Sequence, residues 1–314
     1  MTAKSWRAVL LGTMLVAILL CLVEPLSSQE SRLGVNPGSK LRSGDSAAGS
    51  SAPTFRRWLP PDVDETLPPV APNVACSLPD VLQSVGQRVE ELVANLQSFS
   101  AREVIQHQEI GQDGKMSSPR KRSFDYFVSI RELRPGALAV EEYRDGSMSL
   151  QSFPTSLATA GLSAFALIFH PDYVGDFAIK CEGLGQWHGQ PAWQLHFQQR
   201  ADKPVRFRQY EVNKNRYAVK LKGRAWVAAD TYEVVRIETD LMEPIPAIAL
   251  ESEHLAIDYQ PVKFQKRDVQ LWLPESADLY LDYRGHRYHH RHSFSNFLLF
   301  SVDVTQHIGI PAQR

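Results

Sequence analysis

The residues richest in possible chemistry lie in a short run near the C-terminus, Gly285–His292 (GHRYHHRH). Successive side chains of a β-strand point to opposite faces, so His286, His290 and His292 would share one face, with Tyr288 between them. Imidazoles at alternate strand positions can bind Zn²⁺ or Cu²⁺. No HExxH motif or acidic ligand set accompanies them, and the intervening arginines disfavour a cation. We therefore expect an exposed, mixed polar strand face and keep a metal-dependent enzyme as an alternative.

Sequence patterns for other reactions are missing. There is no GxSxG nucleophile elbow, no phosphate-binding GxxxxGKS/T loop and no GxGxxG turn. Cys181 and His188 could form a thiol–imidazole pair, but nothing around them resembles a cysteine protease. The 34 basic and 35 acidic side chains leave a formal net charge of −1, so nucleic acid is not an expected partner. The sequence predicts a non-catalytic protein that uses no cofactor, nucleotide or nucleic acid.

The N-terminus predicts export from the cytoplasm. Lys4 and Arg7 precede a mostly apolar run, Ala8–Val23, which a Glu-Pro pair and two serines follow. Residues 1–28 therefore have the pattern of a signal peptide. An uncleaved membrane anchor is the alternative, although the run is shorter than the roughly 20 residues that span a bilayer.

Two further segments follow from composition. Residues 29–75 are rich in Ser, Gly and Pro and predict a disordered tether, which leaves residues 76–314 as the folded domain. Once the signal is removed, the remaining cysteines are Cys76 and Cys181. An even pair in an exported chain favours a disulfide, and two unrelated buried thiols are the alternative.

Two stretches predict helices. Apolar residues recur every three or four positions from Leu78 to Leu96, which predicts an amphipathic helix over about 78–97 with Ser77 as its N-cap. Residues 155–170 (TSLATAGLSAFALIFH) are apolar on nearly all sides. Such a helix is either buried in the core or covers an apolar cavity.

From Asp176 onward the pattern is almost wholly β, with short breaks at Gly and Pro. This predicts a mainly β, α+β fold: a strongly curved antiparallel sheet or half-barrel with the two helices on its concave face. The clearest hairpin is Gly223–Asp240. Its alternation places Ala225 and Val227 on one face, and Val235 together with Ile237 on one face of the return strand.

Large aromatic side chains recur through the chain and could line a cavity for an apolar ligand, or pack as an ordinary core. The candidate ligand-binding residues are Phe165, Phe169, Trp187, Trp193, Trp226 and Trp272.

Three segments together resemble a family. The hairpin GRAWVAADTYEVVRIETD, the run LWLPESADLYL and the final strand RGHRYHHRHSFSNFLLF resemble the LolA-like periplasmic lipoprotein-sorting domains and the related RseB/MucB-like domains. The N-terminal helix leading into a strand, over Ser77–Ile110, is also similar. The resemblance covers about residues 76–303, and no ligand-contacting residue of the family can be matched to a position in this sequence.

The resemblance implies an unclosed curved sheet with helices in its mouth and a location in the periplasm or cell envelope. It also implies a non-catalytic role in holding a lipid or a lipoprotein acyl chain. The main alternative is a tethered envelope module with a filled core, which senses or scaffolds a partner protein.

Overall fold

The computed structural model describes residues 59–96, 98–134, 136–145, 161–212 and 215–300. The predicted signal, most of the predicted tether and residues 155–160 of the second predicted helix lie outside these ranges. None of the helices within them has both the length and the apolarity that crossing a bilayer requires.

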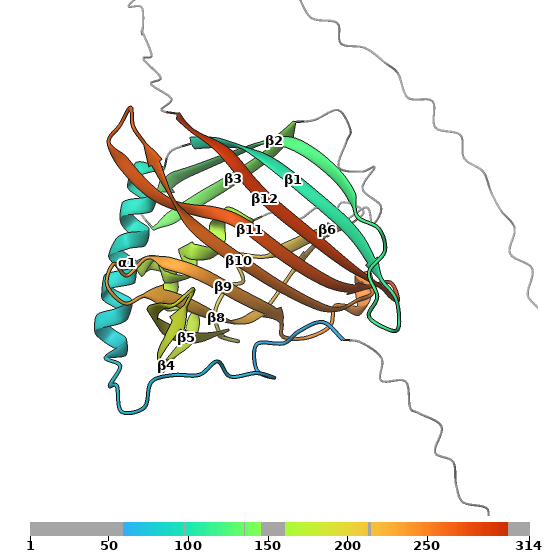
Figure 1. Ribbon diagram of the computed structural model, residues 1–314, viewed down its shortest axis with the longest axis horizontal. Helices are drawn as coiled ribbons and strands as arrows, with labels where there is room; N and C mark the ends of the chain where they lie inside the picture. The colour runs from blue at the N-terminus through green and yellow to red at the C-terminus, as the bar shows by residue number, and fades with distance from the viewer. Residues whose placement is uncertain (1–58, 97, 135, 146–160, 213–214, 301–314) are drawn as a thin grey trace, which may run out of the picture. The chain divides into compact units, whose positions relative to one another are not determined.

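Ten antiparallel strands form one curved sheet that does not close into a barrel (Figure 1). In sheet order they are β3 (Ala137–Asp145), β2 (Arg120–Arg134), β1 (Ser98–Ile110), β12 (His286–Phe300), β11 (Val269–Tyr283), β10 (Leu250–Phe264), β9 (Val234–Leu241), β8 (Leu221–Ala228), β5 (Gln190–Gln199) and β4 (Phe177–Trp187). A separate pair, β6 (Gln209–Val212) and β7 (Asn215–Ala218), lies between β5 and β8 in sequence. The predicted mainly β fold with a curved antiparallel sheet is confirmed, and β3 and β4 are its two edges.

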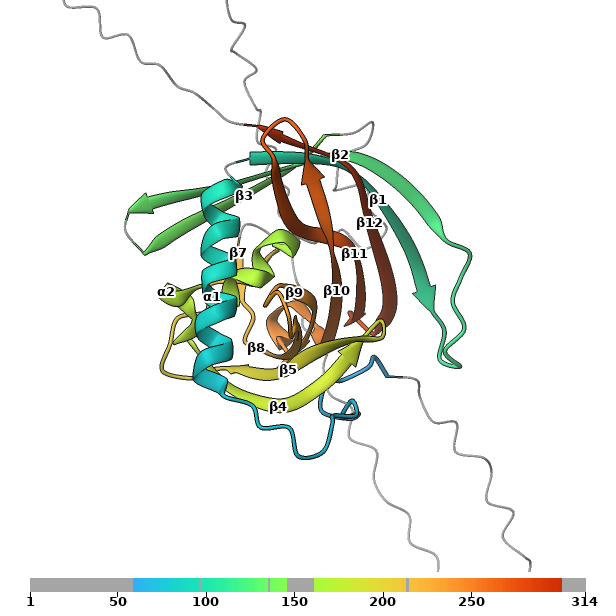
Figure 2. The same ribbon diagram turned by 60° about the vertical axis from the view of Figure 1, so that its left-hand side comes forward.

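The helix α1 (Leu78–Asn95) lies across the opening between the two sheet edges (Figure 2). It buries Val81, Val85 and Val89, the stripe that the sequence predicts. Ser77 occupies the N-cap position, but its side chain makes no capping hydrogen bond. At Gly86 the helix approaches the segment beneath it so closely that an added Cβ would lie 3.3 Å from the carbonyl oxygen of Phe169.

The second apolar segment differs from the predicted helix. Its described part is a 3-10 helix, η2 (Leu162–Phe169), followed by a one-turn helix, α2 (Pro171–Val174). All eight η2 residues are buried. Gly161 precedes η2 with a left-handed φ of 88°, and Pro171 disfavours helical backbone at the residue before it, so both ends are set locally. We call η2 and α2 together the plug, because they fill the concave side of the sheet (Figure 2).

The predicted hairpin forms β8 and β9, with one correction. Ala225 pairs with Ile237, but a register shift follows Trp226. The irregularity puts Val234 in the main core with Ile237, and Val235 in a separate cluster with Trp226 on the outer face. Simple alternation placed Val235 on the same face as Ile237. That prediction is wrong because a bulge changes which side chains share a face.

Residues 59–75, which the sequence places in the tether, lie against the outer face of the sheet, and we call them the strap. Val63 is 2% exposed. Its N–H donates to Asp240 Oδ2 at 2.8 Å, and its carbonyl accepts from Arg224 Nη1 at 2.7 Å. Further along, the N–H of Ala71 donates to the carbonyl of Leu184 on the edge strand β4 at 2.7 Å.

Charge pairs add to these backbone contacts, since Lys222 Nζ lies 2.8 Å from Asp62 and 2.7 Å from Asp64. Contacts made by backbone groups and charged side chains require no periodic apolar pattern in the sequence. Residues 59–75 therefore resemble a tether when only their sequence is considered. The boundaries at residues 28 and 75 stay predictions.

The predicted disulfide is present between Cys76 and Cys181, whose Cα atoms are 6.4 Å apart. Cys76 directly precedes the N-cap of α1, and Cys181 lies in β4. The bond therefore ties the first turn of the helix to one sheet edge across 105 positions of sequence.

We predict that the double variant Cys76→Ser, Cys181→Ser loses about 2–4 kcal/mol of unfolding free energy, because the unfolded chain regains the entropy of an open loop. Urea denaturation of both proteins measures the loss. Adding a thiol reductant should lower the wild-type midpoint and leave the variant unchanged, and equal midpoints for the two proteins without reductant would contradict the prediction.

Candidate functional site

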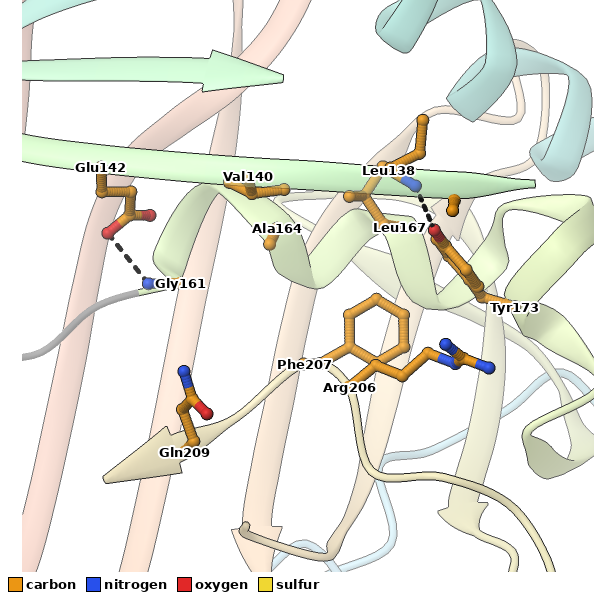
Figure 3. Close-up of a pocket in the computed structure, with 11 residues that line it drawn as sticks. Leu138, Val140, Glu142, Gly161, Ala164, Leu167, Tyr173, Arg206, Phe207 and Gln209 are labelled. Carbon is orange, nitrogen blue, oxygen red and sulfur yellow. Dashed lines mark hydrogen bonds between the residues drawn. The ribbon is translucent and has the colours of Figure 1, made fainter. Parts of the chain in front are cut away.

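A pocket of about 330 Å³ opens at the mouth of the half-barrel, between the edge strand β3 and the plug (Figure 3). Its apolar lining comes from Ala137, Leu138, Val140, Ala164, Leu167, Tyr173 and Phe207. Its polar lining comes from Glu142, Arg206 and Gln209, with the backbone of Gly161. Polar and apolar atoms contribute about equally to its surface. Its size and its mixture of apolar walls with polar groups fit a small-molecule site.

Side-chain hydrogen bonds hold the plug against β2 and β3. The N–H of Leu138 on β3 donates to the Tyr173 hydroxyl at 2.7 Å, and deeper in, the Tyr126 and Ser163 hydroxyls lie 3.1 Å apart. The plug therefore covers the edge of the sheet through a few bonds that involve side chains. A further strand at this edge would instead form a full ladder of backbone hydrogen bonds. Few hydrogen bonds have to break for the plug to move away from β3.

Arg206 borders the pocket at the end near α2. Its guanidinium lies 5.7 Å from the ring centre of Tyr173, and its Nε donates to Asp176 at 3.0 Å. The side chain is 51% exposed, so this ion pair contributes little to stability and can exchange partners.

Behind the plug, the concave wall carries a buried ionic cluster. Arg144 on β3 donates two hydrogen bonds to Glu103 on β1, at 2.5 and 3.0 Å, and His292 on β12 donates a third at 2.7 Å. Burial opposes ionisation of Glu103, but the Arg144 charge and the His292 hydrogen bond outweigh it and lower its pKa to about 2. The cluster thus joins three strands through one carboxylate.

The candidate metal ligands do not converge. His286 is exposed. His290 lies 2.8 Å from His107, and burial holds the pKa of His290 well below its usual range. His292 is engaged by Glu103. Over the described part of the chain, no group of three or more His, Cys, Asp or Glu side chains is arranged to hold a metal ion. The predicted exposed polar face is also wrong for His290 and His292, which are each 1% exposed on the concave side.

The six aromatic candidates divide between the two faces of the sheet. Phe165 and Phe169 belong to η2 and lie in the main core, against which Trp193 packs. Trp187 and Trp226 meet on the outer face, and Trp272 packs against both the outer cluster and the main core. Their role as ligand contacts stays a prediction, and none of the six lines the mouth pocket.

The outer aromatic cluster borders a second cavity of about 480 Å³. Trp187 is covered on its faces by Arg236, 4.5 Å from the ring centre, and by His188, whose ring is stacked at 4.5 Å. Asp230 and Glu275 give its rim an acidic character. This cavity is larger and more apolar than the mouth pocket, but it lies on the outer face of the sheet, away from the plug.

Sequence reasoning missed three residues that line the mouth pocket, Glu142, Tyr173 and Arg206. They come from a strand, a one-turn helix and a loop that are distant in sequence. No local motif joins them, and only the high apolarity of residues 162–169 pointed to this region.

None of the protein-family models and none of the curated proteins matches this chain. Among solved structures, a DUF1329 family protein from Desulfovibrio piger is similar, with a TM-score of 0.40 and 14% identity over 74% of this chain and 95% of that one. A LolA superfamily protein from Nitrosomonas europaea has a TM-score of 0.37 and 10% identity, over 70% and 94%. A third structure, from Vibrio parahaemolyticus, is described as a putative outer membrane lipoprotein-sorting protein domain. It has a TM-score of 0.36 and 10% identity, over 70% of this chain and 93% of that one.

The LolA-like group that the sequence resembles is thus among the solved structures to which this chain is similar. At these identities the likeness concerns the fold alone.

We predict a pH-dependent contribution from Glu103. Its folded pKa of about 2 lies below the ordinary 4.5. Its ionised form therefore stabilises the protein above about pH 5, and the gain, roughly 3 kcal/mol, is lost as the pH falls toward 2. In urea titrations, the stability gap between wild type and Glu103→Gln should narrow over this range. The exposed Glu141→Gln is the matched control, and a gap that is constant with pH would contradict the assignment.

Proposed function

We propose that this protein binds the acyl chain of a lipid or lipoprotein in the mouth pocket, without catalysis, in the periplasm or cell envelope. The observation that carries the proposal is the pocket between β3 and the plug, which has an apolar wall and lies at one edge of the open sheet. Each methylene removed from water contributes about 0.8 kcal/mol, so a single chain supplies enough free energy for binding.

The plug supports this proposal because only a few side-chain hydrogen bonds hold it against β2 and β3. Its apolar side chains occupy the concave face of the sheet, where an acyl chain longer than the pocket would extend. Movement of the whole plug breaks the bonds from Leu138 to Tyr173, between Tyr126 and Ser163, and from Gly161 to Glu142. An acyl chain entering behind it would replace the buried area that the plug loses.

A second candidate is an interaction module with a filled core. The strap favours it, because the outer face already holds an extended polypeptide through Arg224, Lys222 and Asp240. This candidate predicts a partner protein and no bound lipid.

Native mass spectrometry of the purified protein with added decanoyl compounds tests the first proposal. We expect a one-to-one complex, and Val140→Trp should weaken it by about tenfold or more, because the indole fills the pocket where Val140 lines it. Tyr143→Trp is the matched control, since Tyr143 lies on the same strand and is 63% exposed. The lipid proposal fails if no acyl compound binds, or if both variants bind like the wild type.

A further inference from the structure

One carboxylate oxygen in the mouth pocket has no hydrogen-bond donor among the residues that the structure describes. Glu142 projects from β3 into the pocket, and its Oε2 accepts the backbone N–H of Gly161 at 2.9 Å (Figure 3). Its Oε1 is also buried, yet it accepts no hydrogen bond from any residue that the structure describes. A buried acceptor left without a donor costs about 1–3 kcal/mol, and more when it is charged. A ligand that brings a donor to this atom recovers that free energy.

Gly161 holds the carboxylate in place. It has a φ of 88°, and a Cβ added there would lie 3.2 Å from the carbonyl oxygen of Phe207. The left-handed backbone turns the N–H of Gly161 toward β3, where it fixes Oε2 of Glu142. The orientation of the free Oε1 is therefore set by the backbone at the start of η2.

The cations near the pocket are already engaged. Arg206 lies toward the end opposite Glu142 and pairs with Asp176 (Figure 3). Arg144 is near enough to attract Glu142, but its hydrogen bonds go to Glu103. A ligand head placed at Oε1 therefore meets a hydrogen-bond acceptor with negative charge.

Resting on the proposed acyl-binding function, we propose that the mouth pocket selects acyl chains that carry an amide head. The amide N–H donates to Glu142 Oε1, and the chain lies along Val140, Ala164 and Leu167. A carboxylate head brings a second negative charge and no donor, so free fatty acids bind weakly. An ester brings neither the donor nor the charge, so its affinity lies between those of the amide and the carboxylate.

Three ligands with the same chain separate these effects: N-decanoylglycinamide, methyl decanoate and decanoate. Isothermal titration calorimetry of the whole chain should rank them in that order, with the amide bound about tenfold or more tightly than decanoate. In Glu142→Gln the preference should collapse, because the new side chain carries no charge and can donate to a carboxylate. Glu141→Gln removes the same charge from an exposed neighbour on β3 and should keep the wild-type ranking.

The outcomes separate this inference from the proposed function. If all three ligands bind the wild type equally, or if Glu142→Gln keeps the ranking, the role of Glu142 is overturned while acyl binding stands. If none of the three binds, the proposed function fails as well. Near-ultraviolet circular dichroism of both variants checks that each is folded, and Glu142→Asn provides a second substitution with a shorter side chain if the first is not.

Discussion

The structure depends on how a curved sheet that stays open buries the apolar side chains of its concave face. A closed barrel has no edge strands, and side chains from its own strands fill its interior. This sheet instead ends at β3 and β4, and the gap between these edges would expose its apolar interior to water. The plug and α1 occupy that gap. Burial of apolar surface thus stabilises the fold at the same place where a ligand would enter, so stability and binding use one interface.

On the concave wall, buried charges lie next to an apolar core, and each of them therefore needs a partner. Glu103, Arg144 and His292 are each paired, and removing one partner from such a cluster leaves an uncompensated ion in a dry environment. Because the three residues come from β1, β3 and β12, the cluster also links the edge strand to the middle of the sheet. An edge held in this way can lose contact with the plug without detaching from the sheet.

Elements with a regular period were predictable from the sequence, and elements defined by tertiary contacts were not. The stripe of α1 and the strands after Asp176 follow from spacing alone, and the cysteine pair follows from its count in a chain predicted to be exported. The 3-10 form of η2 depends on Gly161 and Pro171 at its ends, and the strap depends on Arg224 and Asp240 far along the chain. The mouth pocket unites residues from β3, η2 and a later loop, so its chemistry has no sequence signature.

The strap and the disulfide together decide how the folded body would respond to tension on its N-terminal side. A pull at residue 59 loads the contacts at Val63 first and the bond from Ala71 to Leu184 later, one after another. The load then arrives at Cys76, where a covalent bond passes it into β4 before it can unwind α1. The non-covalent contacts of the strap yield before the covalent disulfide does, so the disulfide protects the helix and the mouth pocket from the load.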